Sequence, residues 1–315
     1  MPANFLIFAG TNQHNLNIQK QGFMIKPNEY MHPEDAKALR ELESIPGFPT
    51  LVKKVLALGL EKLQYGINMA SAIRLSPTQL PEIYNRLPPI CEKLGIKEPE
   101  FYLSMDPYPN AWTFGDTKIF VTVTSGLLQL LNDEEIDAVI AHECGHIACR
   151  HVLYHSLAHY ILSGADNLGV LGLLSIPIQL AILYWERKSE LSCDRAGSLV
   201  TSPEVVASTM ARLSGGPIDI TEKIDLEEWA RQADQYDTIR NDGIWNKTLQ
   251  IYAIAQQNHP FAAVRVREIL KWGKSEQYQR LMGINPTGTA QHCPNCGNAV
   301  DPAWKFCHFC GNKLF

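Results

Sequence analysis

Two histidines and a glutamate lie close together in the stretch AVIAHECGHIACRH, residues 138–151, which otherwise has the apolar character of a buried helix. On a helix, His142 and His146 lie ~40° apart around the axis and one turn apart along it, so both imidazoles can reach one metal ion. Glu143 lies beside them and can hydrogen-bond a water held on that ion. The alternative is three polar side chains satisfied in a core, but their burial without a partner or a metal is costly. The residue types and their spacing therefore favour the site of a zinc hydrolase.

A catalytic zinc needs a third protein ligand, and the segment WERKSELSCDRAGSL offers one. Glu190 and Asp194 are four residues apart on a predicted helix. Glu190 can complete the metal site, and Asp194 can accept a hydrogen bond from a ligand imidazole and fix its tautomer. Taken alone, the segment also suits a solvated charged face, but the unfilled coordination position of the first motif favours the metal interpretation.

The combination of H-E-x-x-H, E-x-x-x-D, an upstream PNAWTFG and a downstream HPFAAVR resembles the M48 family of zinc metallopeptidases. The resemblance covers roughly residues 78–272. It implies that His142, His146 and Glu190 bind a catalytic zinc. It also implies that Glu143 is the general base and proton shuttle, and that Asp194 is the carboxylate that hydrogen-bonds a ligand imidazole.

The same resemblance implies groups that hold the substrate. Asn110 and Ala111 stand where the family has an Asn-Ala pair, on an edge strand that aligns an extended peptide. His259 matches the late histidine that stabilises the oxyanion, and Arg265 matches its supporting arginine. The implied activity is that of a metalloendopeptidase, which cleaves protein or peptide substrates with an activated water and without a covalent acyl-enzyme.

Local signals predict the elements that position these residues. Asn132 and Glu135 form a capping-box pattern, so a helix is expected to begin near Asp133 and to carry the first motif. Short β-rich runs between residues 99 and 123 predict a small antiparallel sheet. Residues 203–281 are expected to be helical with polar breaks. The predicted fold is α+β and mainly α: a zincin-like metallopeptidase domain with a small antiparallel sheet.

Four cysteines near the C-terminus form two C-x-x-C pairs, each followed by a glycine that permits a tight turn. The pattern resembles a zinc ribbon, and four thiolates would fill the coordination of a structural zinc. We therefore expect two zinc ions, one catalytic and one structural. The expected ligands of the structural zinc are Cys293, Cys296, Cys307 and Cys310. The ribbon itself can serve to bind substrate, a protein partner or nucleic acid.

The predicted organisation has four parts: a helical N-terminal segment without an assigned role (1–75), the peptidase domain (76–282), a linker (283–291) and the ribbon (292–315). The N-terminus has no basic residue before its short apolar patch, so it lacks the layout of a signal peptide. We therefore expect a reducing, cytoplasmic location, in which metal-bound cysteines are favoured over disulfides.

Residues 168–185 form an 18-residue run without a charge and are a membrane-span candidate by hydropathy. The run lies between His146 and Glu190, however, and a single crossing would separate these two residues by about 30 Å. Pro177 suits two short packed helices or a re-entrant hairpin instead. We expect a soluble enzyme, with shallow association with a membrane surface as the alternative.

The net charge of −5 gives no basic field for nucleic acid, which disfavours a nucleic-acid-associated ribbon protein. A second alternative is a catalytically silent protein that keeps the peptidase fold while its ribbon engages a partner. Glu143 argues against it, because a silent relative has no need of the base.

Overall fold

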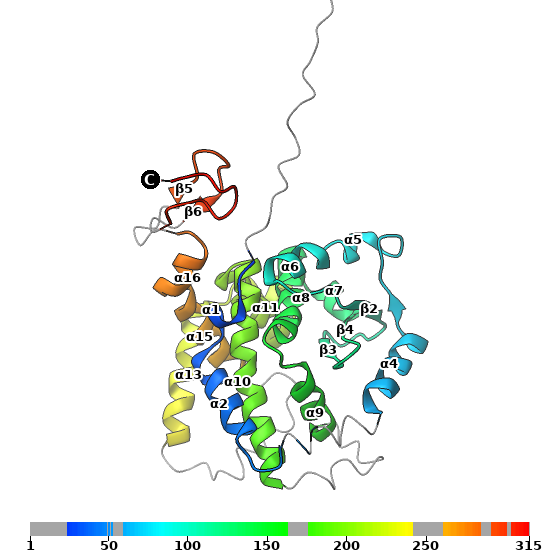
Figure 1. Ribbon diagram of the computed structural model, residues 1–315. Coiled ribbons are helices and arrows are strands. Elements are labelled where there is room, and N and C mark those ends of the chain that lie inside the picture. The colour runs from blue at the N-terminus through cyan, green and yellow to red at the C-terminus, as the bar shows by residue number, and fades with distance from the viewer. Residues whose placement is uncertain are drawn as a thin grey trace, which may run out of the picture.

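The computed structural model describes residues 24–48, 50, 52, 59–162, 176–241, 261–284, 291–300 and 304–314. Helices make up most of this part of the chain, and a small sheet lies to one side of them (Figure 1). The predicted α+β, mainly α fold is therefore confirmed. The N-terminal half contains α1 (Pro27–Tyr30), α2 (Pro33–Glu43), α4 (Leu60–Ser71), α5 (Pro81–Tyr84) and α6 (Leu87–Leu94).

Two helices form the centre of the fold, α8 (Asp133–Ala148) and α10 (Ile176–Val200). Asn132 accepts a hydrogen bond from the backbone of Glu135, whose side chain bonds back to the backbone of Asn132, so the predicted capping box is confirmed. The two helices pack closely at Gly145, where an added Cβ would lie 2.8 Å from the Cβ of Ala196. Glycine at this position therefore lets the motif helix approach α10.

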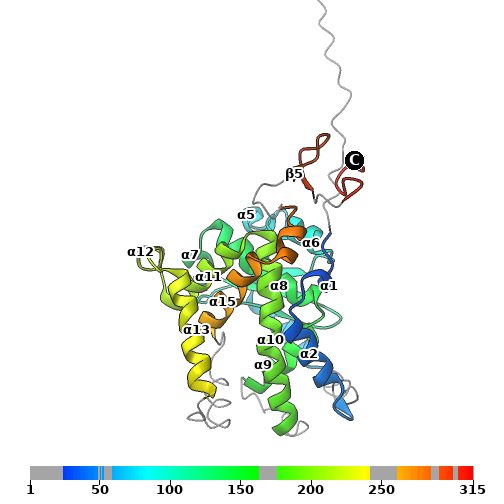
Figure 2. The same cartoon turned by 90° about the vertical axis from the view of Figure 1, so that its left-hand side faces the viewer.

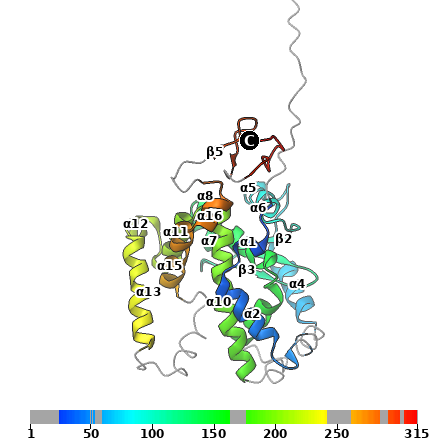
Figure 3. The same cartoon turned by 60° about the vertical axis from the view of Figure 1, so that its left-hand side comes forward.

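The remaining helices surround this pair. Beyond α10 lie α11 (Pro203–Gly215), α12 (Ile218–Thr221), α13 (Leu226–Asn241), α15 (Ala262–Gly273) and α16 (Glu276–Leu281). Figure 3 shows α11, α13 and α15 together on one side of α10, while α2 lies along its other side. The main core joins side chains from these helices, from α8 and from the sheet. The expectation that residues 203–281 are helical is confirmed for the part that the structure describes.

The sheet has the strand order β1-β2-β4-β3, built from β1 (Ile73–Arg74), β2 (Glu100–Ser104), β3 (Ala111–Phe114) and β4 (Phe120–Thr124). Its β1–β2 and β3–β4 pairs are antiparallel, but β2 and β4 are parallel. The expectation of a wholly antiparallel sheet is therefore wrong, and the sheet is mixed. The physical reason is burial: all five residues of β4 are buried, so it takes a central place and β3 moves to the edge.

The chain turns sharply after α8. Arg150 has φ 61° in the break before α9 (Val152–Leu162), and the backbone N–H of His151 donates to the carbonyl of His146 at 2.8 Å. A second apolar cluster joins α2, α9 and α10 around the buried Trp185. Figure 2 shows α2 along α10 in the turned view. The N-terminal helix thus packs against the two helices that follow the first motif.

The apolar run 168–185 is described only from residue 176, where α10 begins. Pro177 lies in the first turn of that helix, a position that tolerates proline. The first part of the run, and with it the expected pair of short helices or hairpin, lies outside the described residues. Among the helices that are described, none has the length and apolarity needed to span a membrane.

Candidate metal centre and substrate pocket

The two motifs meet at the contact between α8 and α10. His142 Nε2 lies 3.4 Å from Glu190 Oε2, and His146 Nε2 lies 3.4 Å from Glu190 Oε1. Atoms bound tetrahedrally to one zinc at ~2.0–2.1 Å lie ~3.4 Å from one another. The set of two imidazole nitrogens and one carboxylate therefore fits zinc in its chemistry, and each of the two imidazoles lies at the spacing of zinc ligands from one oxygen of Glu190.

Asp194 and Arg265 lie behind these three side chains. Asp194 Oδ1 is 3.0 Å from His142 Nδ1, which leaves Nε2 of that ring to face the other donors. Arg265 donates from Nε to Asp194 Oδ2 at 2.8 Å, and its Nη1 lies 3.0 Å from Glu190 Oε2. Burial opposes ionisation of both carboxylates, but the guanidinium and His142 outweigh it and lower the pKa of Asp194 and of Glu190. Both acids are therefore held as carboxylates.

Glu143 lies next to the ligand candidates and is almost completely buried, with 6% of its surface exposed. Thr113, on β3, donates from its hydroxyl to Glu143 Oε2 at 2.7 Å and also lies 3.1 Å from the carbonyl of Glu143. Burial raises the pKa of Glu143, although His142 and Thr113 act in the opposite direction. A carboxyl group with a raised pKa holds a proton more readily, which suits a group that must accept a proton and pass it on.

Three further polar side chains near the centre were not predicted from the sequence: Thr113, His151 and His155. His151 is completely buried beside His146, with ring centroids 5.5 Å apart, and its Nε2 lies 3.1 Å from the Oδ2 of Asp35 on α2. His155, on α9, lies with its Nε2 3.4 Å from Glu190 Oε1. The sequence signal for both is their short distance from the first motif, in CRHVLYH.

A cavity of about 340 Å³ opens beside His142 and Glu143. Asn110 and Ala111 line it; Ala111 is the first residue of the edge strand β3, and Asn110 directly precedes that strand. Arg265 also lines the cavity. The cavity wall away from the charged groups also contains Tyr108, Thr209 and Ser214, but most of its residues are apolar, among them Leu127, Ala138, Val139, Val206, Met210 and Leu213. His259 lies outside the described residues, so its predicted role stays a prediction.

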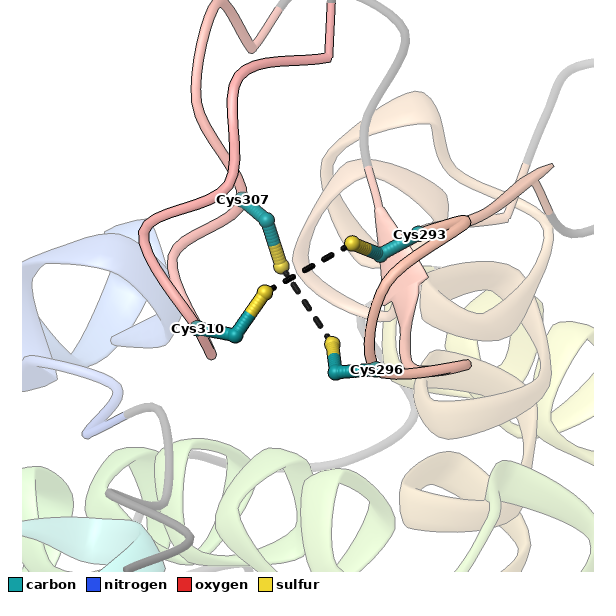
Figure 4. Close-up of side chains that lie close together, drawn as sticks. All are labelled: Cys293, Cys296, Cys307 and Cys310. Atoms are coloured by element: carbon teal, nitrogen blue, oxygen red, sulfur yellow. Dashed lines mark hydrogen bonds between the residues drawn. The ribbon is translucent and has the colours of Figure 1, made fainter. Parts of the chain in front are cut away.

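The four C-terminal cysteines come together in the short β5 (Gln291–His292) and β6 (Ala299–Val300) module and its turns (Figure 4). Cys293 and Cys310 have sulfur atoms 3.6 Å apart, as do Cys296 and Cys307. Sulfur atoms bound tetrahedrally to zinc at ~2.3 Å lie ~3.8 Å apart. The Asn295 side chain and the Asn312 backbone donate to Cys310 and lower the pKa of that thiol to about 6, which favours the thiolate. The cluster therefore fits a zinc ribbon.

Two family models match ranges of the chain that contain these two clusters. The profile of peptidase family M48 matches residues 77–273, and that of a domain of unknown function, DUF7575, matches residues 288–314. The chain is similar to the plastoglobule-localized metallopeptidase 48 of Arabidopsis thaliana, with 31% identity over 261 residues, which cover 81% of this chain and 75% of that protein.

Two bacterial proteins are similar over a shorter range. A protease HtpX homolog of Tropheryma whipplei is 30% identical over 144 residues, covering 43% of this chain and 47% of that protein. A protease HtpX homolog of Pelotomaculum thermopropionicum is 32% identical over 112 residues, covering 33% and 40%. The chain thus spans less than half the length of these two relatives.

Proposed function

The chain belongs to peptidase family M48, and we propose that it is a zinc-dependent metalloendopeptidase. The observation that carries this proposal is that His142 Nε2 and His146 Nε2 each lie 3.4 Å from an oxygen of Glu190, with the buried Glu143 beside them. The matched ranges also support the proposed division into a peptidase domain (76–282) and a ribbon (292–315), preceded by residues 1–75 and joined by the linker 283–291.

In the proposed mechanism, His142, His146 and Glu190 hold the ion. Zinc, when bound, supplies a Lewis acid that brings the ionisation of water into the neutral range. Glu143 takes a proton from the attacking water and delivers it to the leaving amine, and its raised pKa favours this transfer. Thr113 fixes the rotamer of Glu143 through its hydroxyl.

The groups around the ion have supporting roles in this proposal. Asp194 fixes the tautomer of His142, and Arg265 keeps Asp194 ionised. Asn110 and Ala111 bind the extended backbone of the substrate at the edge of the sheet. His259 is proposed to stabilise the oxyanion, as the sequence resemblance implies.

The cavity beside Glu143 suggests the substrate class. Its apolar wall and its volume of about 340 Å³ suit a large aliphatic or aromatic side chain. A peptide aligned along β3 would place that side chain in the cavity and the neighbouring peptide bond beside Glu143. We therefore propose that the enzyme cleaves protein or peptide chains next to a large apolar residue.

The C-terminal cysteines are proposed to hold a second, structural zinc, and the ribbon is proposed to bind a protein partner. Modules of this size have too small an apolar core to fold alone, so bound metal is their main source of stability. The cytoplasmic location stays a prediction, because the plant relative is named for plastoglobules.

The decisive experiment combines metal analysis with peptide cleavage by the wild type and the Glu143→Gln variant. We expect two zinc ions per chain in both proteins and a loss of cleavage of at least about 100-fold in the variant, since the proton transfer is removed while the ligands remain. Thr113→Val is a matched control that removes only the hydrogen bond to Glu143 and is expected to lower kcat less. Equal turnover by wild type and Glu143→Gln would contradict the mechanism.

A further inference from the structure

A third imidazole faces the oxygen atoms of Glu190. His155 lies one turn into α9, and the sharp turn at Arg150 brings that helix back toward the metal centre. His155 Nε2 is 3.4 Å from Glu190 Oε1, the oxygen atom that also faces His146 Nε2 at 3.4 Å. The rings of His146 and His155 have centroids 4.0 Å apart. His155 is therefore as close to Glu190 as the two histidines of the H-E-x-x-H motif are.

The distance from each imidazole to Glu190 is that between two ligands of one metal ion. Donor atoms around a tetrahedral zinc lie ~3.4 Å apart, and Nε2 lies 3.4 Å from Glu190 Oε1 in His146 and His155 and 3.4 Å from Oε2 in His142. The ligand atoms of His146, His155 and Glu190 also lie within 4.8 Å of one another. A distance of 3.4 Å is long for a charge-assisted hydrogen bond, so direct pairing of His155 with Glu190 explains the position less well.

His155 also has a second partner, Ser189. Its Nε2 lies 3.3 Å from Ser189 Oγ, and the Ser189 hydroxyl already donates its hydrogen to the carbonyl of Glu186 at 2.7 Å. Ser189 can therefore only accept from His155, which requires a proton on Nε2. Metal binding requires the lone pair of the same nitrogen. The two contacts exclude each other, so His155 can either bind zinc or donate to Ser189.

We propose that His155 is a displaceable fourth protein ligand of the catalytic zinc. If His155 bound the ion together with His142, His146 and Glu190, four protein side chains would occupy its coordination, which is the pattern of a zinc that does no chemistry. With His155 turned to Ser189, the fourth position is free for water and the site is competent. The inference rests on the proposed function, because it requires zinc on His142, His146 and Glu190.

The test measures zinc release from the zinc-loaded full chain into an excess of a chromogenic chelator. The phase of release that disappears in His146→Ala identifies the peptidase site and separates it from the ribbon. We expect His155→Gln to accelerate this phase at least about tenfold, because a ligand is lost. We expect Ser189→Ala to slow it, because His155 then loses its alternative partner. A crystal structure of the zinc-loaded protein is expected to show His155 Nε2 at about 2.1 Å from the ion.

Each contrary result has a distinct meaning. Unchanged release in His155→Gln, with zinc still on His142, His146 and Glu190, would overturn the inference and leave the proposed function intact. Faster zinc release in His155→Gln with unchanged zinc release in Ser189→Ala would also overturn the inference. This pair of results is expected if His155 only orients Glu190 and does not bind zinc. Absence from the wild type of the zinc that His146→Ala loses would overturn the proposed function itself. Should His155→Gln fail to fold, Ser189→Ala and the zinc-loaded structure decide the question.

Discussion

A buried carboxylate on α2 lies close to the proposed metal centre. Asp35, on α2, is completely buried and accepts hydrogen bonds from Trp185 Nε1 at 3.1 Å and from the hydroxyl of Ser192, both on α10. Its Oδ2 also lies 3.1 Å from His151 Nε2. His151 is bonded through its backbone N–H to the carbonyl of His146. We therefore expect the loss of Asp35 to weaken both the fold and the metal site.

The expected loss in the free energy of unfolding follows from the groups that lose their hydrogen bond to Asp35 in Asp35→Ala. Trp185 and Ser192 would each lose a hydrogen-bond partner in a buried place, at about 1–3 kcal/mol for each unsatisfied group. We take about 4 kcal/mol as the expected loss in the free energy of unfolding. For a domain of this size that corresponds to a fall in Tm on the order of 10 °C.

The assay is thermal unfolding of the full chain, followed by circular dichroism, with zinc content measured on the same samples. Glu34→Ala is the matched control: Glu34 precedes Asp35 in the same helix, its side chain is 48% exposed and it lies 3.5 Å from Lys188. A surface pair of this kind contributes about 0–1 kcal/mol, so Tm should barely change. We further expect lower zinc retention in Asp35→Ala only. The same Tm in both variants would refute the idea that Asp35 supports the site.

Three further predictions concern pH, specificity and the ribbon. Burial, aided by Arg195, lowers the pKa of His32 to about 4 from the 6.5 of the exposed group, so the folded protein favours the neutral ring. Because the unfolded chain binds this proton more readily, the free energy of unfolding should fall by about 2 kcal/mol between pH 7 and pH 5, as measured by urea titration. This contribution should be absent in His32→Asn. A wild-type slope in His32→Asn would contradict this assignment. Ala138→Leu narrows the cavity and should raise KM at least about tenfold for peptides with a large apolar side chain at the cleavage site. For peptides with alanine at that position, KM should rise less. Equal increases in KM for both peptides would argue against the cavity as the specificity site. Cys296→Ser should remove one zinc per chain while cleavage of short peptides persists, and loss of both zinc ions would show that the two sites are coupled.

The parts of the site that follow local rules could be predicted from the sequence. The capping box fixes the start of α8, and the helical repeat then places His142 and His146 on one face. The position of Glu190 beside these histidines could be predicted because a catalytic zinc needs a third ligand of a known type and because its own helix spacing pairs Glu190 with Asp194. Each of these inferences uses only neighbours within one turn, together with the chemistry of the ion.

The parts that depend on tertiary packing could not be predicted in the same way. The parallel pairing of β2 with β4 depends on which strand is buried on both faces, which alternation alone does not reveal. Thr113 lies 30 residues before Glu143 and meets it only because the edge strand packs against α8. No pattern in the sequence distinguishes Asp35 and His151 from other polar residues. Their importance comes from a contact between segments 116 positions apart.

Residues 24–48 are better explained as a support than as a removable cover. A cover would line the cavity and leave the metal ligands in place when displaced, but none of these residues lines the cavity beside Glu143. Tyr30 is instead part of the main core, and Arg195 on α10 donates to its carbonyl at 3.0 Å. Asp35 reaches the metal centre through His151, from the side of α10. Removal of this segment would therefore expose core and free a buried histidine beside His146, which weakens the site instead of opening it.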